Sequence, residues 1–463
     1  MMKRNWKGSR ILVIGAARQG LAVTRFLVER GAEVILNDNR PARDMTTATE
    51  ALAGLPIRWE FGGHPLNLLN EGLDLICVSG GVPLTLPLLI EAGRQGIPIS
   101  NDSQIFMEAV PCKVVGITGS AGKTTTTTIV GRMAQAGIAS PRKSWVGGNI
   151  GQPLIEYLDE IKPDDLVVLE LSSFQLEIMT CVPQISAVLN ITPNHLDRHG
   201  TMEAYTAAKA RIITHQSTGD TTILNREDPG SWNLAGDVRG QLISFGLQKP
   251  VGGLAGTYVE NRILKFTDGQ IQNELFPQEK ILLRGEHNLI NVLAACAIAI
   301  GAGIPQEAMR AGVEDFHGVA HRLELVRVRQ GVEWYNDSIA TAPERTIAAI
   351  RAFDTPLVLM LGGRDKNLPW EDLAALVHDR VKHVVLFGEA AAKIQKALGE
   401  TFPGRNPQTI QHCNNLFDAV QAAASVAKAG DCVLLSPGGT SYDEFKDFEE
   451  RGEQYRKWVN QLT

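Results

Sequence analysis

The stretch "KVVGITGSAGKTTTTTIV", which starts at Lys113, limits the possible folds of this chain more than any other segment. Its β-branched beginning predicts a buried strand, and the residues from Lys123 onward predict a helix. The glycines between them allow backbone N–H groups to approach an anion at the start of that helix. A strand, a glycine-rich loop and a helix in this order predict a parallel α/β sheet with a phosphate-binding loop at its edge.

This loop departs from the general pattern G-x-x-x-x-G-K-[ST], because Ile117 stands where that pattern has its first glycine. We expect the loop backbone to hold nucleotide phosphates, Lys123 to reach the β- and γ-phosphates, and Thr124 to offer its hydroxyl to Mg²⁺. The alternative is a glycine-rich turn that binds nothing. The residues expected to bind ATP here are Gly119, Ser120, Ala121, Gly122, Lys123, Thr124 and Thr125.

Apolar runs alternate with amphipathic helical runs along most of the 463 residues, which predicts parallel sheets covered by helices. The length is too great for one ordinary core. We predict three α/β domains: a Rossmann-like domain over residues 1–110, a central P-loop domain over 111–317, and a C-terminal Rossmann-like domain over 318–463. Short alternating runs with turn residues predict a small antiparallel part of the central domain at 241–283.

The composition excludes several classes of protein. A net charge of -6 argues against a general nucleic-acid binder. The six cysteines form no C-x-x-C pair and are expected to be free thiols in a reducing compartment. The apolar stretch "VLAACAIAIGAGI" from Val292 is shorter than the ~18 residues of a membrane span, and no signal peptide is evident. We expect a cytoplasmic protein with no membrane partner.

The N-terminal segment "GAARQG" from Gly15 imitates the dinucleotide pattern G-x-G-x-x-G, with Ala17 in place of the middle glycine. An alanine there hinders the approach of a pyrophosphate, so NAD binding by an oxidoreductase is only one interpretation. Asp38 follows the second predicted strand and suits a contact to ribose or uracil.

Four further residues suggest chemistry. Glu170 ends an apolar strand, where a carboxylate is well placed for Mg²⁺ or is an ordinary acid at a strand end. His195 and His199 stand four residues apart, but no H-E-x-x-H glutamate accompanies them, which argues against zinc. Lys209 lies in a predicted helix, where a solvated lysine is the default.

Motifs along nearly the whole chain then give a consistent resemblance. The central segment contains "VGGNIGQPL", "LELSSFQLE", "LNITPNHLDRHG", "YTAAKARI" and "GEHNLINVLAA", and the last part contains "HRLE", "NDSIATAPE", "LGGRDK" and "SPGGTSYDEFKDFEERG". With the shortened phosphate loop, this set resembles the Mur ligases and the related folylpolyglutamate synthases. The Rossmann-like N-terminal domain and "SYDEFKDFEERG" favour the branch that adds D-glutamate.

The resemblance implies an ATP-dependent ligase of peptidoglycan precursor synthesis. It would join D-glutamate to UDP-N-acetylmuramoyl-L-alanine through an acyl phosphate, releasing ADP and phosphate. Lys123, Glu170, His195 and Lys209 match catalytic positions of the family. The last three, with Thr124, would hold two Mg²⁺ ions, Lys209 as a carbamate formed with CO₂. His199 is expected to be structural. We expect a monomer.

The resemblance also implies the remaining binding residues. ATP would further contact Asn288, Arg322 and Asp337. The UDP-sugar would contact Ala16, Arg18, Gln19, Asp38, Asn39, Arg40, Ser79, Gly80, Asn149, Ser172 and Gln175. D-Glutamate would contact Thr341, Lys366, Ser441, Tyr442 and Phe448, and the last domain would close over the nucleotide. One departure is that Ile339 and Ala342 replace a lysine and an asparagine that many relatives have.

Other functions compete with this one. Another Mur-type ligase would add a different amino acid, and a folate enzyme would lack the N-terminal domain. A dinucleotide-binding oxidoreductase leaves the second phosphate loop unexplained, and an NTP-dependent switch does not need Lys209 and His195.

Overall fold

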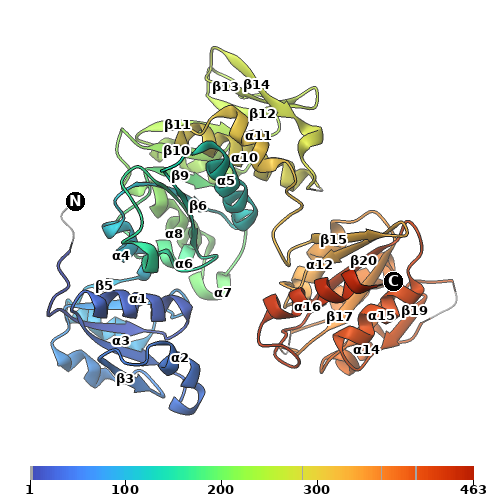
Figure 1. Cartoon of the computed structure of the whole chain (residues 1–463), viewed down its shortest axis with the longest axis horizontal. Helices are drawn as coiled ribbons and strands as arrows, with labels where there is room; N and C mark the ends of the chain where they lie inside the picture. The colour runs from blue at the N-terminus through green and yellow to red at the C-terminus, as the bar shows by residue number, and fades with distance from the viewer. Residues whose placement is uncertain (1–3, 284, 367, 402–403, 463) are drawn as a thin grey trace. The chain divides into compact units, whose positions relative to one another are not determined.

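The computed structural model describes residues 4–283, 285–366, 368–401 and 404–462 (Figure 1). They divide into two compact units. The first unit holds the described residues up to Leu282 together with Glu286–Phe316, and the second holds Leu283, Gly285 and the described residues from His317 onward.

The first unit contains two sheets, of which the N-terminal one is entirely parallel, with the order β3-β2-β1-β4-β5. Its central strand is buried because helices cover both faces, as expected for a Rossmann-like domain. The elements are β1 (Arg10–Ile14), α1 (Arg18–Glu29), β2 (Glu33–Asp38), η1 (Ala42–Asp44), α2 (Thr46–Ala51), β3 (Ile57–Phe61), η2 (Leu66–Glu71), β4 (Leu75–Val78), α3 (Pro87–Arg94), β5 (Ile99–Ser100) and α4 (Asp102–Ala109).

The second sheet of this unit has the order β14-β13-β12-β11-β10-β9-β6-β8-β7. Its strands are β6 (Lys113–Thr118), β7 (Ser144–Gly148), β8 (Leu166–Glu170), β9 (Ile185–Val188), β10 (Thr221–Asn225), β11 (Gln241–Phe245), β12 (Gly256–Glu260), β13 (Ile263–Thr267) and β14 (Gln272–Pro277). Its helices are α5 (Lys123–Gly137), η3 (Leu154–Tyr157), α6 (Ser173–Leu176), α7 (Leu196–His199), α8 (Met202–Thr214), α9 (Pro229–Trp232), η4 (Asn233–Asp237), η5 (Gln278–Lys280), α10 (Glu286–Ala302) and α11 (Gln306–Val313).

The antiparallel part is smaller than the sequence pattern predicts. β11 pairs in parallel with β10 and with β12, so the antiparallel pairing starts with β12 and β13 rather than at Gln241. β11 packs against α10 and buries Ile243 and Phe245, as an inner strand of a covered parallel sheet does. A local pattern of short runs cannot distinguish such a strand from a hairpin arm.

The second unit holds a sheet of order β15-β16-β20-β17-β18-β19, parallel except for the edge strand β15. Its elements are β15 (Glu324–Arg329), β16 (Val332–Asn336), α12 (Pro343–Arg351), β17 (Leu357–Gly362), α13 (Glu371–Arg380), β18 (Val381–Phe387), α14 (Ala391–Leu398), β19 (Thr409–His412), α15 (Leu416–Val426), β20 (Cys432–Gly438) and α16 (Phe448–Gln461). The inner strands were predicted from their apolar runs, whereas the half-exposed edge strands β15 and β19 were not.

The three sheets confirm the predicted α/β class, and helices of the described residues are too short or too polar to cross a membrane. The helix that follows the glycine-rich loop, α5, packs against α10 and α11 (Figure 1). The contact with α11 is close because Gly312 has no side chain: a Cβ there would lie 2.7 Å from the Met133 nitrogen.

Adding that methyl group in Gly312→Ala should lower the melting temperature by several degrees, because overpacking a tight contact costs about 1–3 kcal/mol. The matched control is Gly93→Ala on α3, where a Cβ meets nothing within 4 Å. The control should keep or raise the melting temperature, since alanine favours a helix over glycine. Calorimetry of both variants checks this, and equal melting temperatures would contradict the packing.

Candidate active site

The glycine-rich loop connects β6 to α5, as the sequence predicted. Gly122 begins the helix with a φ of 81°, a conformation that residues with a side chain rarely adopt. Its Cα also approaches the Asn291 side chain too closely for a Cβ to fit. Asn291 donates to Asn288 Oδ1 at 3.2 Å, so the first turns of α10 lie against the loop. Asn288 is therefore near the loop, as its predicted role in ATP binding requires.

Asn190, which directly follows Leu189 beyond β9, holds the other half of the loop. Its side chain exchanges two hydrogen bonds with the Ala121 peptide, from Ala121 N to Oδ1 at 2.8 Å and from Nδ2 to Ala121 O at 3.1 Å. Its carbonyl accepts from Ser120 N at 2.9 Å. Asn190 lies in the motif "LNITPNHLDRHG", but no role was predicted for it from the sequence.

The Ser120 hydroxyl is also used inside the protein. It donates to Thr192 O at 2.9 Å, accepts from Thr192 N at 3.0 Å and lies 3.0 Å from the Tyr205 hydroxyl. Ser120 therefore helps to anchor the loop to the chain after β9. Its main-chain N–H is likewise donated to Asn190 O, so both donors of Ser120 hold the loop in place.

Two lysines converge on one carbonyl of the loop. Lys123 donates to Gly119 O at 2.7 Å, and Lys209, from α8, donates to the same oxygen at 2.9 Å. Lys209 is only 1% exposed. Burial, together with the charge of Lys123, lowers the pKa of its amine to about 7, and Glu170 opposes the shift. The predicted helix around Lys209 is confirmed, and the alternative of a solvated lysine does not apply.

Glu170 ends β8, beside β6, and is 2% exposed. Asn149 Nδ2 donates to its Oε1 at 3.0 Å. Its Oε2 is buried and has no hydrogen-bond partner among the described residues. A buried carboxylate oxygen without a donor is unfavourable, whereas a hard cation such as Mg²⁺ prefers this kind of ligand. The residues here therefore fit a metal ion.

His195 lies at the start of α7 with a φ of 53° and an exposed side chain. Its ring meets the edge of Phe174 at 5.0 Å between centroids. His199 stacks on the same ring at 5.3 Å and lies 3.0 Å from Ser173 Oγ, in agreement with a structural role. Across the described residues, no group of three or more His, Cys, Asp or Glu side chains is arranged to hold a metal.

The N-terminal sheet places its predicted substrate residues at the ends of β1, β2 and β4, but Asp38 already has partners. Its carboxylate accepts from Ala16 N at 2.8 Å and from Arg40 Nε at 2.9 Å. The hydrogen bond from Arg40 holds the pKa of this carboxyl well below its usual range. Asp38 therefore holds Arg40 and the Ala16 backbone in place, and its contact with ribose or uracil stays a prediction. Arg18, Asn39 and Arg40 are exposed, and Gly80 is partly exposed.

Several residues expected to touch the sugar substrate instead join the two sheets of the first unit. Gln19 donates to Gly148 O at 3.0 Å, next to Asn149. Ser172 and Gln175 form the capping box of α6, and the Gln175 amide also donates to Ser103 at 2.8 Å. Gln175 is 1% exposed, so its side chain is packed inside this unit. Ser79 donates to Gly15 O at 3.1 Å and closes the turn after β1.

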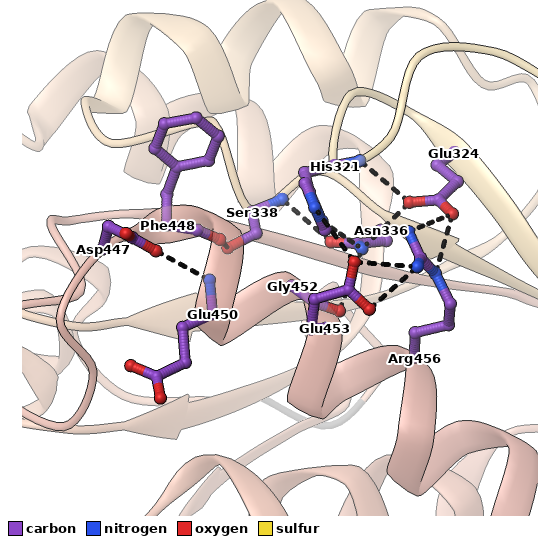
Figure 2. Close-up of polar contacts among 10 residues, drawn as sticks. All are labelled: His321, Glu324, Asn336, Ser338, Asp447, Phe448, Glu450, Gly452, Glu453 and Arg456. Carbon is purple, nitrogen blue, oxygen red and sulfur yellow. Dashed lines mark hydrogen bonds and ion pairs between the residues drawn. The ribbon is translucent and has the colours of Figure 1, made fainter. Parts of the chain in front are cut away.

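In the second unit, Lys366 donates to Thr341 at 3.4 Å, so two of the residues predicted to bind D-glutamate are together. Ser441 is buried, and Tyr442 is 61% exposed. Phe448 is the first residue of α16, and its carbonyl accepts from Ser338 at 2.8 Å (Figure 2).

The segment around Arg322, predicted to hold the nucleotide, is tied to the end of β16. Asn336 donates to His321 Nδ1 at 3.0 Å, and Leu323 N donates to Asp337 at 3.2 Å (Figure 2 shows the former). Ser436 also donates to Asp337, and burial raises the pKa of this carboxyl to about 7. Arg322 itself is exposed. Ile339, in place of the commoner lysine, is half-buried, and Ala342 is the N-cap of α12.

Comparison with known proteins identifies the family. Residues 9–101 match the model of the Mur ligase MurD-like N-terminal domain, 117–299 the Mur ligase middle domain, and 321–439 the Mur ligase glutamate ligase domain. The UDP-N-acetylmuramoylalanine–D-glutamate ligase of Symbiobacterium thermophilum is 40% identical and covers 98% of both chains. That of Geobacillus kaustophilus is 40% identical over 99% of both. This chain belongs to the Mur ligase family.

Solved Mur ligases share the fold at low identity. The UDP-N-acetylmuramate-alanine ligase MurC of Thermotoga maritima superposes with a TM-score of 0.57 at 18% identity, covering 98% of this chain and 99% of the other. The resemblance inferred from the motifs is therefore confirmed. The dinucleotide-binding oxidoreductase alternative has no support from these relatives.

In this Mur ligase, removal of Asn190's side chain should loosen the phosphate loop, because Asn190→Ala deletes both hydrogen bonds to the Ala121 peptide. At about 0.5–1.5 kcal/mol each, their loss should weaken binding of an ATP analogue roughly tenfold. Titration with a fluorescent analogue measures this. Asn233→Ala, which changes an exposed residue of the same unit, is the control and should bind normally. Equal affinities would contradict the anchoring role.

Proposed function

We propose that this Mur ligase forms an amide bond between the carboxylate of UDP-N-acetylmuramoyl-L-alanine and the amine of D-glutamate. ATP is consumed, and ADP and phosphate are released. The observation that carries this function is the full-length similarity, at up to 40% identity, to relatives named UDP-N-acetylmuramoylalanine–D-glutamate ligase. The free cysteines are compatible with a reducing cytoplasm, where peptidoglycan precursors would be made.

The reaction needs an activated carboxylate. Transfer of the γ-phosphoryl group of ATP gives an acyl phosphate and ADP, and attack by the amine then expels phosphate. Lys123 would turn from Gly119 O toward the transferred phosphate, where its charge offsets the negative charge that develops. The N–H groups at the start of α5 would hold the other phosphates. Asn288 and, from the second unit, Arg322 and Asp337 would contact the nucleotide.

We propose that Mg²⁺ is bound by the Thr124 hydroxyl and Glu170, with His195 and Lys209 serving a second ion. Bound metal would neutralise phosphate charge and polarise the phosphoryl group. The unpartnered Oε2 of Glu170 supports the assignment of that residue. Asn149 orients Glu170 through Oε1, which is the role we give it instead of a direct substrate contact.

Lys209 is proposed to carry a carbamate. A bare ammonium beside Lys123 would repel a metal ion, whereas a carbamate supplies anionic oxygens. CO₂ adds to the neutral amine with formation of an N–C bond, and the amine nitrogen releases a proton to solvent. The lowered pKa of Lys209 makes that neutral form available near pH 7, and its position between Gly119 and Glu170 supports the assignment.

The N-terminal sheet is proposed to bind the UDP part of the sugar substrate through Arg18, Asn39, Arg40 and the backbone of Ala16 and Gly80. In the second unit, D-glutamate would meet Lys366, Thr341 and Ser441, with Phe448 and Tyr442 beside its methylenes. Closure of the last domain on the nucleotide remains a prediction from the chemistry, since water would hydrolyse an exposed acyl phosphate.

The amino-acid specificity tests this function directly. With UDP-N-acetylmuramoyl-L-alanine and ATP, D-glutamate should be incorporated, whereas D-alanine and L-alanine should fail. A site built for a second carboxylate leaves its cation unpaired with alanine, a mismatch that can reach ~10⁴-fold. L-Glutamate should fail because inversion at Cα misplaces the amine or a carboxylate. Mass spectrometry of the competition products decides, and preferred incorporation of L-alanine would refute the assignment.

Lys209→Ala should be almost inactive with all three substrates, because the proposed anionic ligand is missing. Small carboxylates such as acetate should restore part of the turnover by occupying its place. Wild-type enzyme in CO₂-depleted buffer should lose activity and regain it when bicarbonate is added. A Lys209→Ala variant that turns over normally, or a wild-type enzyme indifferent to bicarbonate, would contradict the carbamate.

A further inference from the structure

Arg451 is an unusual residue for the interior of the second unit: it is fully buried on α16, at 0% exposure. Its guanidinium donates from Nε to Ser338 Oγ at 2.9 Å, from Nη2 to Ser338 O at 2.8 Å and from Nη1 to Gly439 O at 3.1 Å. No carboxylate of the described residues forms an ion pair with it. The arginine is thus a buried cation held by neutral oxygens.

These oxygens belong to two loops that leave the sheet at the same edge, after β16 and after β20. A third loop, after β17, passes close by, because a Cβ on Gly363 would lie 2.9 Å from Arg451 Nη1. The loops after β17 and β20 also pair with each other. Arg364 N donates to Thr440 O, and Thr440 N donates to Arg364 O, both at 2.8 Å. One guanidinium therefore lies beneath three loops.

The same loops carry the residues proposed to bind D-glutamate. In each loop, a residue proposed to bind D-glutamate lies within three residues of one that is next to Arg451. These pairs are Ser338 and Thr341, Gly439 and Ser441, and Gly363 and Lys366. Lys366 and Thr341 are joined by their hydrogen bond of 3.4 Å.

Phe448 is connected as well. It lies one helical turn before Arg451 on α16. Ser338 Oγ accepts from Arg451 and donates to the Phe448 carbonyl at 2.8 Å, a bond drawn in Figure 2. The arginine and this serine thus link the apolar side of the pocket to its polar loops.

We propose that Arg451 is the positioning residue of the amino-acid pocket: it sets the spacing of the three loops and attracts the second carboxylate of the incoming amino acid. This inference rests on the proposed function, because it assigns a role within the D-glutamate site. Arg451 lies in the segment "SPGGTSYDEFKDFEERG", which carries part of the family resemblance, but no role was predicted for it from the sequence.

The physical basis has two parts. A planar guanidinium forms directed hydrogen bonds, which fix the distance between the loops that it joins. Its positive charge is retained, because burial lowers the pKa of the guanidinium only to about 10. The negative charges of Asp443, Glu444 and Asp337 oppose this shift. A buried cation without an anion in contact favours a bound anion nearby more strongly than an exposed one does.

The test is Arg451→Met, which removes the charge and the hydrogen bonds but keeps much of the volume. The KM for D-glutamate should rise about tenfold or more, while the KM values for ATP and UDP-N-acetylmuramoyl-L-alanine should change less than about threefold. Arg451→Lys, which keeps the charge but not the fork, should give an intermediate KM. High D-glutamate should restore turnover.

The matched control is Arg327→Met. Arg327 also donates three hydrogen bonds, to the carbonyls of Val459, Asn460 and Leu462, but at the opposite end of α16. Its loss should lower the melting temperature without changing the KM for D-glutamate. This control separates a role in the pocket from a general effect on stability.

A second reaction separates this inference from the proposed function. Hydroxylamine can replace D-glutamate as the amine and trap the acyl phosphate as a hydroxamate, with release of phosphate. Arg451→Met should form hydroxamate at nearly the wild-type rate. If wild-type enzyme forms hydroxamate but does not incorporate D-glutamate, the proposed function fails, whatever Arg451 does.

Ser338→Ala covers the case in which Arg451→Met does not fold. It removes the Oγ that connects Arg451 with Phe448, and it should raise the KM for D-glutamate severalfold while leaving hydroxamate formation intact. The inference is overturned if the folded variants keep a normal KM for D-glutamate, or if the KM values for all three substrates rise together.

Discussion

The position of β6 between β8 and β9, with all three strands parallel, is the constraint on which the candidate active site depends. Parallel strands end at one edge, so the loop after β6, Glu170 after β8 and Asn190 after β9 meet there. The Gly119 carbonyl then receives Lys209 from α8. Residues separated by up to 90 positions in the chain become one site through this single arrangement.

Buried charged side chains occur in both units at sites where function is proposed. Glu170 and Lys209 are buried at the phosphate loop, and Asp337 and Arg451 are buried in the second unit. Each is costly to desolvate, so each has hydrogen bonds to fixed groups or retains an oxygen available for a cation. We infer that the two units use the same physical means: charges are held in place before the anionic substrates bind, which reduces reorganisation during the reaction.

Several residues predicted to contact substrates already have partners within the protein. Asp38 was expected to bind a nucleoside, but its oxygens bind Arg40 and Ala16. Gln175 was expected near the sugar, but its amide is buried between the two sheets of the first unit. A motif identifies residues that matter at a site. The hydrogen bonds of the folded chain distinguish residues that are available to a ligand from residues that position other side chains and loops. Arg451 belongs to the second kind.

The sequence by itself determined the α/β class, the phosphate loop and the family. Buried parallel strands are continuous apolar runs, and a loop that binds phosphate needs glycines followed by lysine and threonine at short range. The tertiary structure decided what depends on distant partners. The parallel direction of β11, the unpaired oxygen of Glu170, the low pKa of Lys209 and the three loops around Arg451 each arise from contacts between segments far apart in the chain. No local pattern encodes them, because burial and hydrogen bonding are set by which segments pack together.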